Sequence, residues 1–200
     1  MGCYAFALCR AVGPEGHVLC VEPLEDLARL LRAAADRLGL PMTVVNCALS
    51  FQPGTADLQV PWVLGQRRHA FASLEHAGDG GETHRVELRR LDDVVAGVGR
   101  RISFIKIDAE GHELAILRGS VATLRQHHPN LLVEIEQRHS PVSVQETIDY
   151  ILSQGYDGYF LDASGSRRPL GQFDVSRDQE AWLGDIESKN YINKFIFIHR

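Results

Sequence analysis

Hydrophobic residues along this 200-residue chain fall into short apolar runs that alternate with stretches of helical spacing. The run "HVLCVEP" at 17–23 is closed by an acid and a proline, and "ISFIKID" at 102–108 ends at an aspartate, so both predict buried strands. Residues 24–40, directly after the first run, predict an amphipathic helix that ends at Gly39. The expected buried face of this helix carries Leu27, Leu30, Leu31, Ala34 and Leu38.

The same two patterns extend over most of the chain. We expect further helices over 2–13, 91–98, 109–126 and 144–154, and further strands over 42–50, 56–62, 83–90, 130–136, 155–162 and 194–200, with a loop at 76–82. Strands that alternate with helices of this length predict an α/β fold with an open, doubly wound, mostly parallel sheet. In such sheets ligands bind beyond the carboxyl ends of the strands, so candidate site residues should follow the strands directly.

Length and charge limit the classes of function. A chain of 200 residues suits a single domain with a sizeable core. The net charge of −5 argues against nucleic acid as a main partner, because phosphate binding needs a clustered basic face. The arginine clusters are only pairs, at 67–68, 89–90, 100–101 and 167–168.

Cysteine usage and hydropathy bear on location. The four cysteines, Cys3, Cys9, Cys20 and Cys47, sit among apolar residues and form no CxxC pair, which favours buried free thiols in a reducing compartment. No apolar run reaches the roughly 18 to 20 residues of a membrane span. The apolar stretch at 3–9 has no basic segment before it and is not typical of a signal peptide. We therefore expect a cytoplasmic protein without a transmembrane segment.

Two of the expected strands end in residues suited to a nucleotide-like ligand. Glu22 follows the strand at 17–23 and lies 20 positions after Gly2, which is the spacing between a glycine turn and an acid that accepts hydrogen bonds from ribose hydroxyls. An exposed acid at a helix start is the alternative interpretation. Cys47 and Ala48, after the strand that begins at 42, would leave room for a flat base over the same crevice, unless they form an ordinary strand exit.

The stretch "IKIDAEGHEL" at 105–114 places more titratable chemistry at a strand end than any other part of the chain. Asp108 can cap the helix that follows, and Glu110 suits the positive end of its dipole. Gly111 costs about 1 kcal/mol in a helix, which is better explained if another group packs against its backbone. His112 is a candidate general base near neutral pH, or a half-exposed helix residue.

A metal site is a further alternative at this strand end. Asp108, Glu110, His112 and Glu134 offer oxygen ligands and an imidazole, but their spacing matches no metal signature, so we expect no metal.

These residues resemble the signature of the FkbM family of S-adenosylmethionine-dependent methyltransferases. "FIKIDAEGHELAILRGS" at 104–120, followed by "PNLLVEIE" at 129–136, is similar to the family's K-I-D-x-E-G-x-E segment, its L-x-G helix end and its glutamate-containing strand. The stretches 12–23, 89–95, 155–162 and 190–200 also resemble the family, so that the resemblance covers most of the chain.

The resemblance implies a class I, Rossmann-like methyltransferase fold with an antiparallel C-terminal strand. It implies transfer of a methyl group from S-adenosylmethionine to a hydroxyl of a small molecule, a sugar or a glycan. Carried over to this chain, Gly2 belongs to the glycine turn of the cofactor site and Glu22 binds ribose. Cys47 and Ala48 face adenine, and Asp108 lies near the methionine moiety of the cofactor.

Three residues are candidates for the base that removes the hydroxyl proton: His112, Asp108 and Glu110. We prefer His112 because its pKa needs the least adjustment. A carboxylate would serve if desolvation raised its pKa.

The chain departs from the family pattern at its start. The family's first strand and most of its glycine turn precede the position that "MGCY" matches. We therefore expect residues 1–200 to form a single methyltransferase domain that lacks its first strand, either because Met1 is an internal methionine or because the chain is a fragment.

Two other classes remain as alternatives. A nicotinamide-dependent oxidoreductase would share a related fold but gives the K-I-D-x-E-G segment no role. A non-catalytic binding or interaction protein would keep the fold without turnover, and stabilisation by S-adenosylmethionine would separate a cofactor binder from a protein that binds nothing. The sequence names neither the acceptor nor the oligomeric state.

Overall fold

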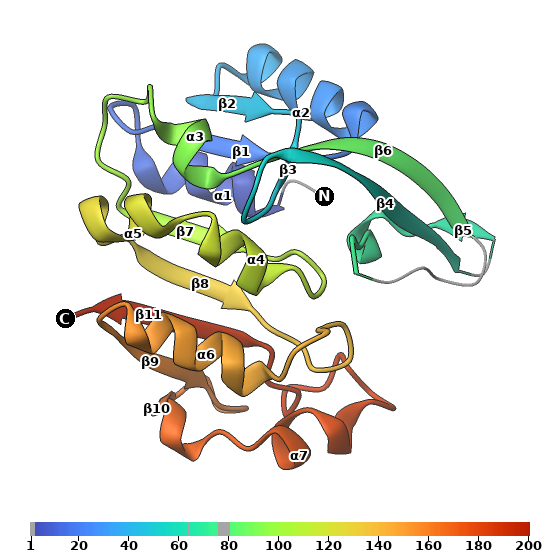
Figure 1. Ribbon diagram of the computed structural model, residues 1–200, viewed down its shortest axis with the longest axis vertical. Helices are drawn as coiled ribbons and strands as arrows, with labels where there is room; N and C mark the ends of the chain where they lie inside the picture. Colours follow the sequence, from blue (N-terminus) through green and yellow to red (C-terminus); the bar gives the residue numbers. More distant parts are fainter. Residues whose placement is uncertain (1–2, 64, 76–80) are drawn as a thin grey trace.

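Helices and strands alternate along the chain in the computed structural model, which describes residues 3–63, 65–75 and 81–200 (Figure 1). The helices are α1 (Cys3–Val12), α2 (Glu25–Leu38), α3 (Leu91–Val95), α4 (Glu113–Arg118), α5 (Val121–His127), α6 (Val144–Ser153) and α7 (Val175–Asp178), with 3-10 turns η1 (His69–Phe71), η2 (Leu170–Gln172) and η3 (Glu180–Trp182). The strands are β1 (Val18–Val21), β2 (Met42–Val45), β3 (Ala48–Leu49), β4 (Gly54–Val63), β5 (Gln66–Arg67), β6 (Gly81–Arg89), β7 (Phe104–Ile107), β8 (Asn130–Glu134), β9 (Tyr156–Leu161), β10 (Arg167–Pro169) and β11 (Lys194–His199).

The strands form three sheets and not the single doubly wound sheet that the sequence predicts. The largest has the order β10-β9-β11-β8-β7, the second pairs β1 with β2, and the third has the order β3-β6-β4-β5. The pairs β1–β2, β7–β8 and β3–β6 are parallel, whereas β11 runs antiparallel to both β8 and β9. The antiparallel C-terminal strand is therefore confirmed, and the fold is mixed α/β.

Strands β1 and β7 belong to different sheets. Each of these strands is paired on one edge only among the described residues, β1 with β2 and β7 with β8. Figure 1 shows the β1–β2 sheet above the five-stranded sheet, with the arrows of β1, β2 and β8 pointing the same way. The hairpin of β4 and β6 adds a separate antiparallel sheet, which the parallel prediction did not include.

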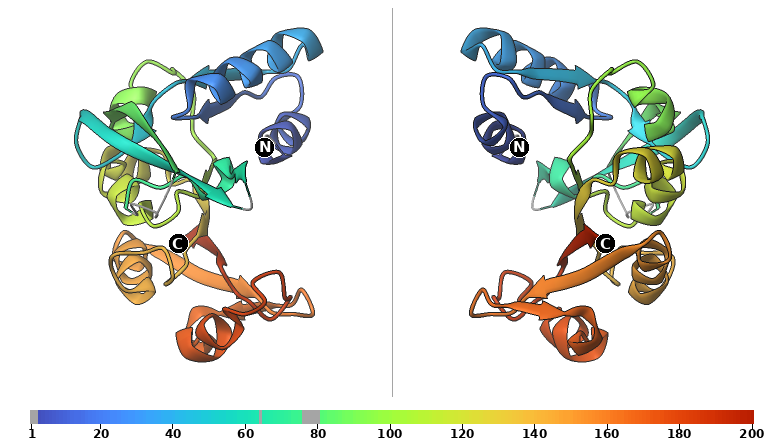
Figure 2. Two further views of the ribbon diagram at one scale, coloured as in Figure 1. Left: turned by 90° about the vertical axis from the view of Figure 1, so that its right-hand side faces the viewer. Right: turned by 90° about the vertical axis from the view of Figure 1, so that its left-hand side faces the viewer.

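The main core lies between the five-stranded sheet and the helices α4, α5 and α6. Leu117, Leu131, Ile151 and Phe195, which come from helices and strands on both sides of this core, are all fully buried. Figure 2 shows these three helices on one side of the strands and α1 on the other. None of the helices in the described part of the chain is both long and apolar enough to cross a bilayer.

Helix α2 buries a narrower face than the sequence predicts. Its buried residues are Leu27, Ala28, Leu31 and Ala35, whereas Leu30 and Leu38 remain 60% and 64% exposed. The helix packs on β2 through Ala28 and Leu31, and Leu27 packs on residues of β4 and β6. Gly39 closes the helix with a left-handed φ of 60°, as predicted.

Two predicted elements are each divided by a side-chain or backbone contact. The expected helix over 109–126 becomes α4 and α5, with a break at Gly119, where a Cβ would lie 2.1 Å from the carbonyl oxygen of Ser50. The expected strand over 42–50 becomes β2 and β3, because Asn46 turns its amide back to the carbonyl oxygens of Glu22 and Pro23.

The approach of Ser50 to Gly119 gives a direct test of this packing. We expect Gly119→Ala to lower the free energy of unfolding by about 1 to 3 kcal/mol, because the added methyl group must displace the Ser50 backbone. Gly97→Ala is the control, since nothing lies within 4 Å of its added Cβ. Urea unfolding of both variants decides the point, and equal stabilities would contradict the close contact.

Candidate active site

The carboxyl ends of β7 and β8 meet at one edge of the five-stranded sheet. Ile107 is paired with Val133 in the parallel ladder, so the next residues, Asp108 and Glu134, lie side by side at this edge. The Lys106 ammonium donates a hydrogen bond to the Asp108 carboxylate. The residues that follow two neighbouring strands thus converge here, which is where the sequence directed the search.

The chain leaves β7 through a strained turn. Glu110 has a φ of 47° and Gly111 a φ of 102°, a region that side chains rarely occupy. A Cβ at Gly111 would lie 2.0 Å from the carbonyl oxygen of His139. The prediction that another group packs against the Gly111 backbone is confirmed, and the group is the segment after β8.

Glu113 holds this turn, and Asp108 does not. One carboxylate oxygen of Glu113, which is 2% exposed, accepts hydrogen bonds from the backbone N–H groups of Ala109 (2.9 Å) and Gly111 (3.2 Å). The prediction that Asp108 caps the next helix is wrong, because α4 begins at Glu113 with His112 as its N-cap. The turn of Ala109 to Gly111 separates Asp108 from the helix, whose N-cap makes no side-chain hydrogen bond.

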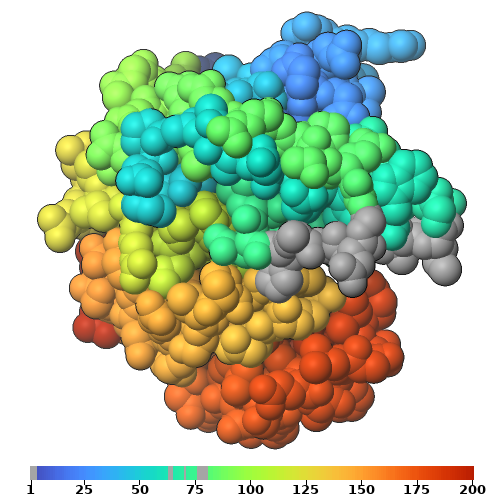
Figure 3. All heavy atoms as spheres, turned by 45° about the vertical axis from the view of Figure 1, so that its right-hand side comes forward, coloured from blue at the N-terminus to red at the C-terminus, as the bar shows by residue number. Residues whose placement is uncertain are grey.

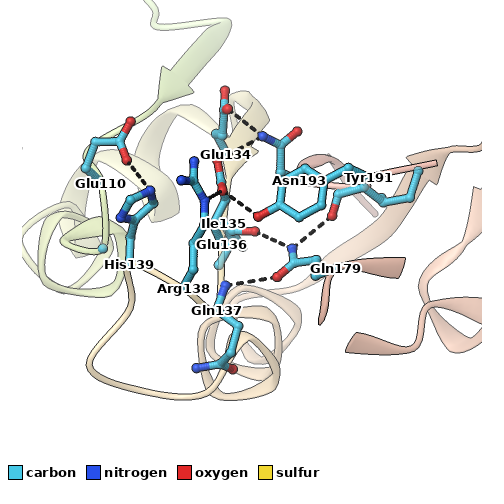
Figure 4. Close-up of polar contacts among 12 residues, drawn as sticks. Glu110, Glu134, Ile135, Glu136, Gln137, Arg138, His139, Gln179, Tyr191 and Asn193 are labelled. Atoms are coloured by element: carbon cyan, nitrogen blue, oxygen red, sulfur yellow. Dashed lines mark hydrogen bonds and ion pairs between the residues drawn. The ribbon is translucent and has the colours of Figure 1, made fainter. Parts of the chain in front are cut away.

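Glu110 and His139 face each other in the site (Figure 4). The Nε2 atom of His139 lies 3.0 Å from Oε2 of Glu110, and both side chains are less than one-fifth exposed. Burial, and then repulsion by Asp108 and Glu136, raise the pKa of Glu110 from 4.5 to about 8. A carboxyl group and an imidazole in contact at this pKa can hold and release a proton near neutral pH.

A second carboxylate, that of Glu136, follows the end of β8 and differs from Glu110 in its ionisation. Glu136 accepts hydrogen bonds from Tyr191 Oη (2.5 Å), Asn193 Nδ2 (3.0 Å) and the Arg138 guanidinium. Burial alone would raise the pKa of Glu136, but these hydrogen bonds outweigh burial and lower it. Glu136 therefore stays ionised beside Glu110.

Seven residues enclose a small cavity of about 10 Å³ at the centre of this group. They are Asp108, Glu110, Gly111, Glu113, Glu134, Glu136 and His139. Burial and the charge of Asp108 raise the pKa of Glu134, while Lys194 and Lys106 oppose that shift. The edge of the sheet is thus strongly acidic, and a positively charged ligand group would complement it.

His112 points away from this cavity. Its Nδ1 atom lies 2.5 Å from Glu75 Oε1, and its Nε2 atom lies 3.0 Å from Ser50 Oγ. Ser73, near Glu75, donates a hydrogen bond from its hydroxyl to the Glu110 carbonyl oxygen at 2.8 Å. The structure therefore brings Asp108 and Glu110 together without His112, and the metal-ligand set that includes His112 is not assembled. A role for His112 as the base stays a prediction.

The other expected cofactor residues lie at the carboxyl ends of β1 and β2. Glu22 Oε1 accepts a hydrogen bond from the Leu24 N–H at 2.9 Å, and burial raises the pKa of Glu22. The side-chain amide of Asn46 bonds to the Glu22 carbonyl oxygen at 2.9 Å, so the exits of the two strands are tied together.

Cys47 and Ala48 are 1% and 6% exposed, and Ala48 belongs to the core cluster beneath α2. At the end of β2, the backbone and the Asn46 side chain are therefore more available to a ligand than the side chains of Cys47 and Ala48. Gly2 lies outside the described residues.

The site contains residues that sequence reasoning missed. The positions of Glu136 and His139, two and five residues after β8, are the signal that could have found them, but the strand expected over 130–136 includes Glu136 and ends three residues before His139. Ser73 and Glu75 carry no such signal, because they come from the segment after η1 and meet the turn only through tertiary folding.

Comparisons with known proteins agree on one family. Residues 2–157 match the model of the methyltransferase FkbM domain. The chain is also similar in structure to a methyltransferase FkbM from Methylobacillus flagellatus KT, with a TM-score of 0.57 and 17% identity over 98% of this chain and 40% of that one. The chain thus spans about two fifths of the length of that protein, and at this identity the likeness concerns the fold alone. No curated protein matches the chain.

The raised pKa of Glu110 gives a prediction about stability. Between about pH 4.5 and pH 8 the folded protein keeps a proton on Glu110 that the unfolded chain releases, so stability falls as pH rises through this window. We expect the free energy of unfolding of Glu110→Gln to fall less steeply with pH than that of the wild type. Urea unfolding from pH 5 to 8.5 measures both. Glu187→Gln, at an exposed position, should keep the wild-type slope. If the free energy of unfolding changed with pH by the same slope in all three proteins, the raised pKa of Glu110 would be contradicted.

Proposed function

We propose, on the premise that the chain belongs to the FkbM methyltransferase family, that it methylates a hydroxyl oxygen of a small molecule, a sugar or a glycan with S-adenosylmethionine as donor. The observation that carries this proposal is the contact between Glu110 and His139 at the carboxyl end of β7. A methyltransferase that acts on a hydroxyl needs a proton-accepting group more than one that acts on an amine or a thiolate.

The reason lies in the proton that a hydroxyl carries. Its oxygen becomes a strong nucleophile only as this proton leaves, so a base within hydrogen-bond reach accelerates the step. The pKa of Glu110, at about 8, is close to the pH at which such a base works best. The Nε2 atom of His139 lies 3.0 Å from Oε2 of Glu110, so the two side chains together can hold the proton.

The residues at the strand ends fit the cofactor that we propose. S-adenosylmethionine supplies a methyl group on a positively charged sulfur, and the acidic edge complements this charge. Glu22 has one carboxylate oxygen on the Leu24 N–H, and its other oxygen, which has no hydrogen-bond partner among the described residues, can accept from ribose hydroxyls. Asp108 is 37% exposed and can bind the amine of the methionine moiety. Gly2, Cys47 and Ala48 complete the proposed cofactor set.

The proposal also covers the class of acceptor, the location and the extent of the domain. The net charge of −5 favours an acceptor other than nucleic acid. A reducing cytoplasm is the proposed location, since Cys9, Cys20 and Cys47 are free. We propose that residues 1–200 act as one methyltransferase domain.

Two histidine variants test which imidazole acts as the base. We expect His139→Ala to slow the release of S-adenosylhomocysteine by about a hundredfold or more with hydroxyl acceptors, while cofactor affinity stays near the wild-type value. His112→Ala should slow it much less, because His112 is bonded to Ser50 and Glu75.

The opposite order of the two variants would assign the base to His112, as the sequence predicts. Product release with amine or thiol acceptors alone would contradict methylation of a hydroxyl oxygen.

A further inference from the structure

A segment from outside the five-stranded sheet lies against the candidate active site. Residues 66–75, which we call the strap, contain β5 and η1 and lie between β4 and β6 in the sequence. Figure 1 shows the strap on the side of the molecule toward which the arrows of β1, β2 and β8 point. In Figure 3 its blue-green atoms lie beside the yellow-green and yellow-orange atoms of the segments that follow β7 and β8. The strap therefore lies at the strand ends that carry the candidate site.

The first part of the strap is fastened to the segments that follow β1 and β8. The guanidinium of Arg67 lies 3.4 Å from Oδ2 of Asp26, in the first turn of α2. Arg67 Nε also lies 3.0 Å from Glu82 Oε2 on β6, so the same side chain joins the strap to the hairpin. Farther along, the guanidinium carbon of Arg138 lies 6.0 Å from the centre of the Phe71 ring, a distance at which a cation is attracted to a ring.

Ser73 is fixed by its backbone and directs its hydroxyl group at the Glu110 turn. It is 4% exposed, and its N–H and C=O groups bond to the C=O and N–H groups of Gln59 on β4, at 3.0 and 2.9 Å. Its Oγ accepts a hydrogen bond from the Glu75 N–H at 3.1 Å and donates one to the Glu110 carbonyl oxygen at 2.8 Å. Because β4 fixes the backbone of Ser73, the hydroxyl group is a firmly placed donor.

The backbone of Glu110 is strained and depends on such contacts. A residue with a side chain keeps a φ of 47° only when its surroundings fix it. Glu113 bonds to the N–H groups on either side of Glu110, whereas Ser73 bonds to the carbonyl oxygen of Glu110 itself. Since the backbone angles set the direction of the side chain, the Ser73 hydrogen bond also directs the Glu110 carboxyl group toward His139.

The last residue of the strap is fastened to the helix that follows the turn. The Glu75 Oε1 atom lies 2.5 Å from Nδ1 of His112, the N-cap of α4. Nε2 of His112 lies 3.0 Å from Oγ of Ser50, which is 2% exposed. The strap is therefore held at the end of the turn as well as at Glu110, so Ser73 cannot move away from the turn independently.

We propose that Ser73 is a positioning residue, which keeps the Glu110 carboxyl group against His139 through its hydrogen bond to the Glu110 backbone. Ser73 acts on the reaction through Glu110 and not by contact with the reacting atoms. The placement of Glu110 stands on the contacts described above, whereas its importance for methyl transfer rests on the proposed function. The two parts are measured separately, because the titration of Glu110 requires neither cofactor nor acceptor.

The titration of Glu110 reports whether its carboxyl group stays in place. We expect the carboxyl carbon of Glu110, assigned by comparison with Glu110→Gln in carbon-13 NMR spectra of the full chain, to titrate near pH 8 in the wild type. In Ser73→Ala the carboxyl group should move toward water, so that its pKa falls by about 1 or more. The charged groups that face Glu110 are the same in both proteins, namely Asp108, Glu134, Glu136, Arg138 and His139.

Two further variants separate the hydrogen bond from a general loss of stability. Ser73→Thr keeps a hydroxyl group and suits extended backbone, so it should restore the wild-type titration of Glu110. Ser120→Ala loses an equally buried hydrogen bond from a hydroxyl to a backbone carbonyl, that of Ile116 at 2.6 Å, and should leave this titration unchanged.

Four results would overturn the placement of Glu110 by Ser73. Glu110 of the wild type would titrate near its usual 4.5, or Ser73→Ala would titrate like the wild type. Alternatively, Ser120→Ala would shift the titration as much as Ser73→Ala does, or Ser73→Thr would fail to restore it.

Turnover tests the part that rests on methyl transfer. With S-adenosylmethionine and simple hydroxyl probes, phenol and methyl α-glucopyranoside, Ser73→Ala should lower kcat about tenfold or more while KM for S-adenosylmethionine stays near the wild-type value. Ser73→Thr should recover most of this loss. A shifted titration of Glu110 with an unchanged kcat would overturn the importance of the positioning for catalysis. A shifted titration without release of S-adenosylhomocysteine by the wild type would instead count against the proposed function and leave the placement by Ser73 standing.

Discussion

The close approach of the Gly111 backbone to the His139 carbonyl oxygen is the constraint on which the rest of the site depends. Only a residue without a Cβ permits it, and the same turn forces Glu110 into a left-handed conformation. Glu113 holds the turn from the helix side, and Ser73 holds it from the segment after η1. Because the turn is fixed on both sides, the Glu110 carboxyl group lies against the His139 ring and not in solvent.

The surroundings of two neighbouring carboxyl groups shift their pKa values in opposite directions. Glu136 is surrounded by donors, and its pKa falls, whereas Glu110 faces other acids in a buried place, and its pKa rises to about 8. Pairs of titratable groups whose environments separate their pKa values are typical of acid–base sites. Since Tyr191 and Asn193 hold Glu136 and come from the C-terminal segment, the acidic site depends on contacts between residues that are distant in the sequence.

Much of the fold followed from the sequence, because apolar periodicity reports local structure well. The helix at 24–40 followed from apolar spacing, the constraint at Gly111 from the cost of glycine in a helix, and the antiparallel C-terminal strand from the resemblance to the FkbM family. What failed depended on contacts distant in sequence. Leu30 is exposed although it lies on the predicted apolar face of α2, and Asp108 does not cap the next helix because the turn of Ala109 to Gly111 separates it from α4. The contacts of His112 with Ser50 and Glu75 form only in the folded chain, so the sequence could not show them.

Binding of S-adenosylmethionine tests the proposed cofactor site most directly. Calorimetric titration of S-adenosylmethionine into this 200-residue chain, and into a chain carrying any in-frame residues upstream of Met1, measures its binding. The account predicts one site per chain in at least one of the two proteins, with Glu22→Ala weakening binding by about tenfold or more through lost charged hydrogen bonds. The absence of binding in both proteins, or full affinity in Glu22→Ala, would contradict a cofactor site at the carboxyl ends of β1 and β7.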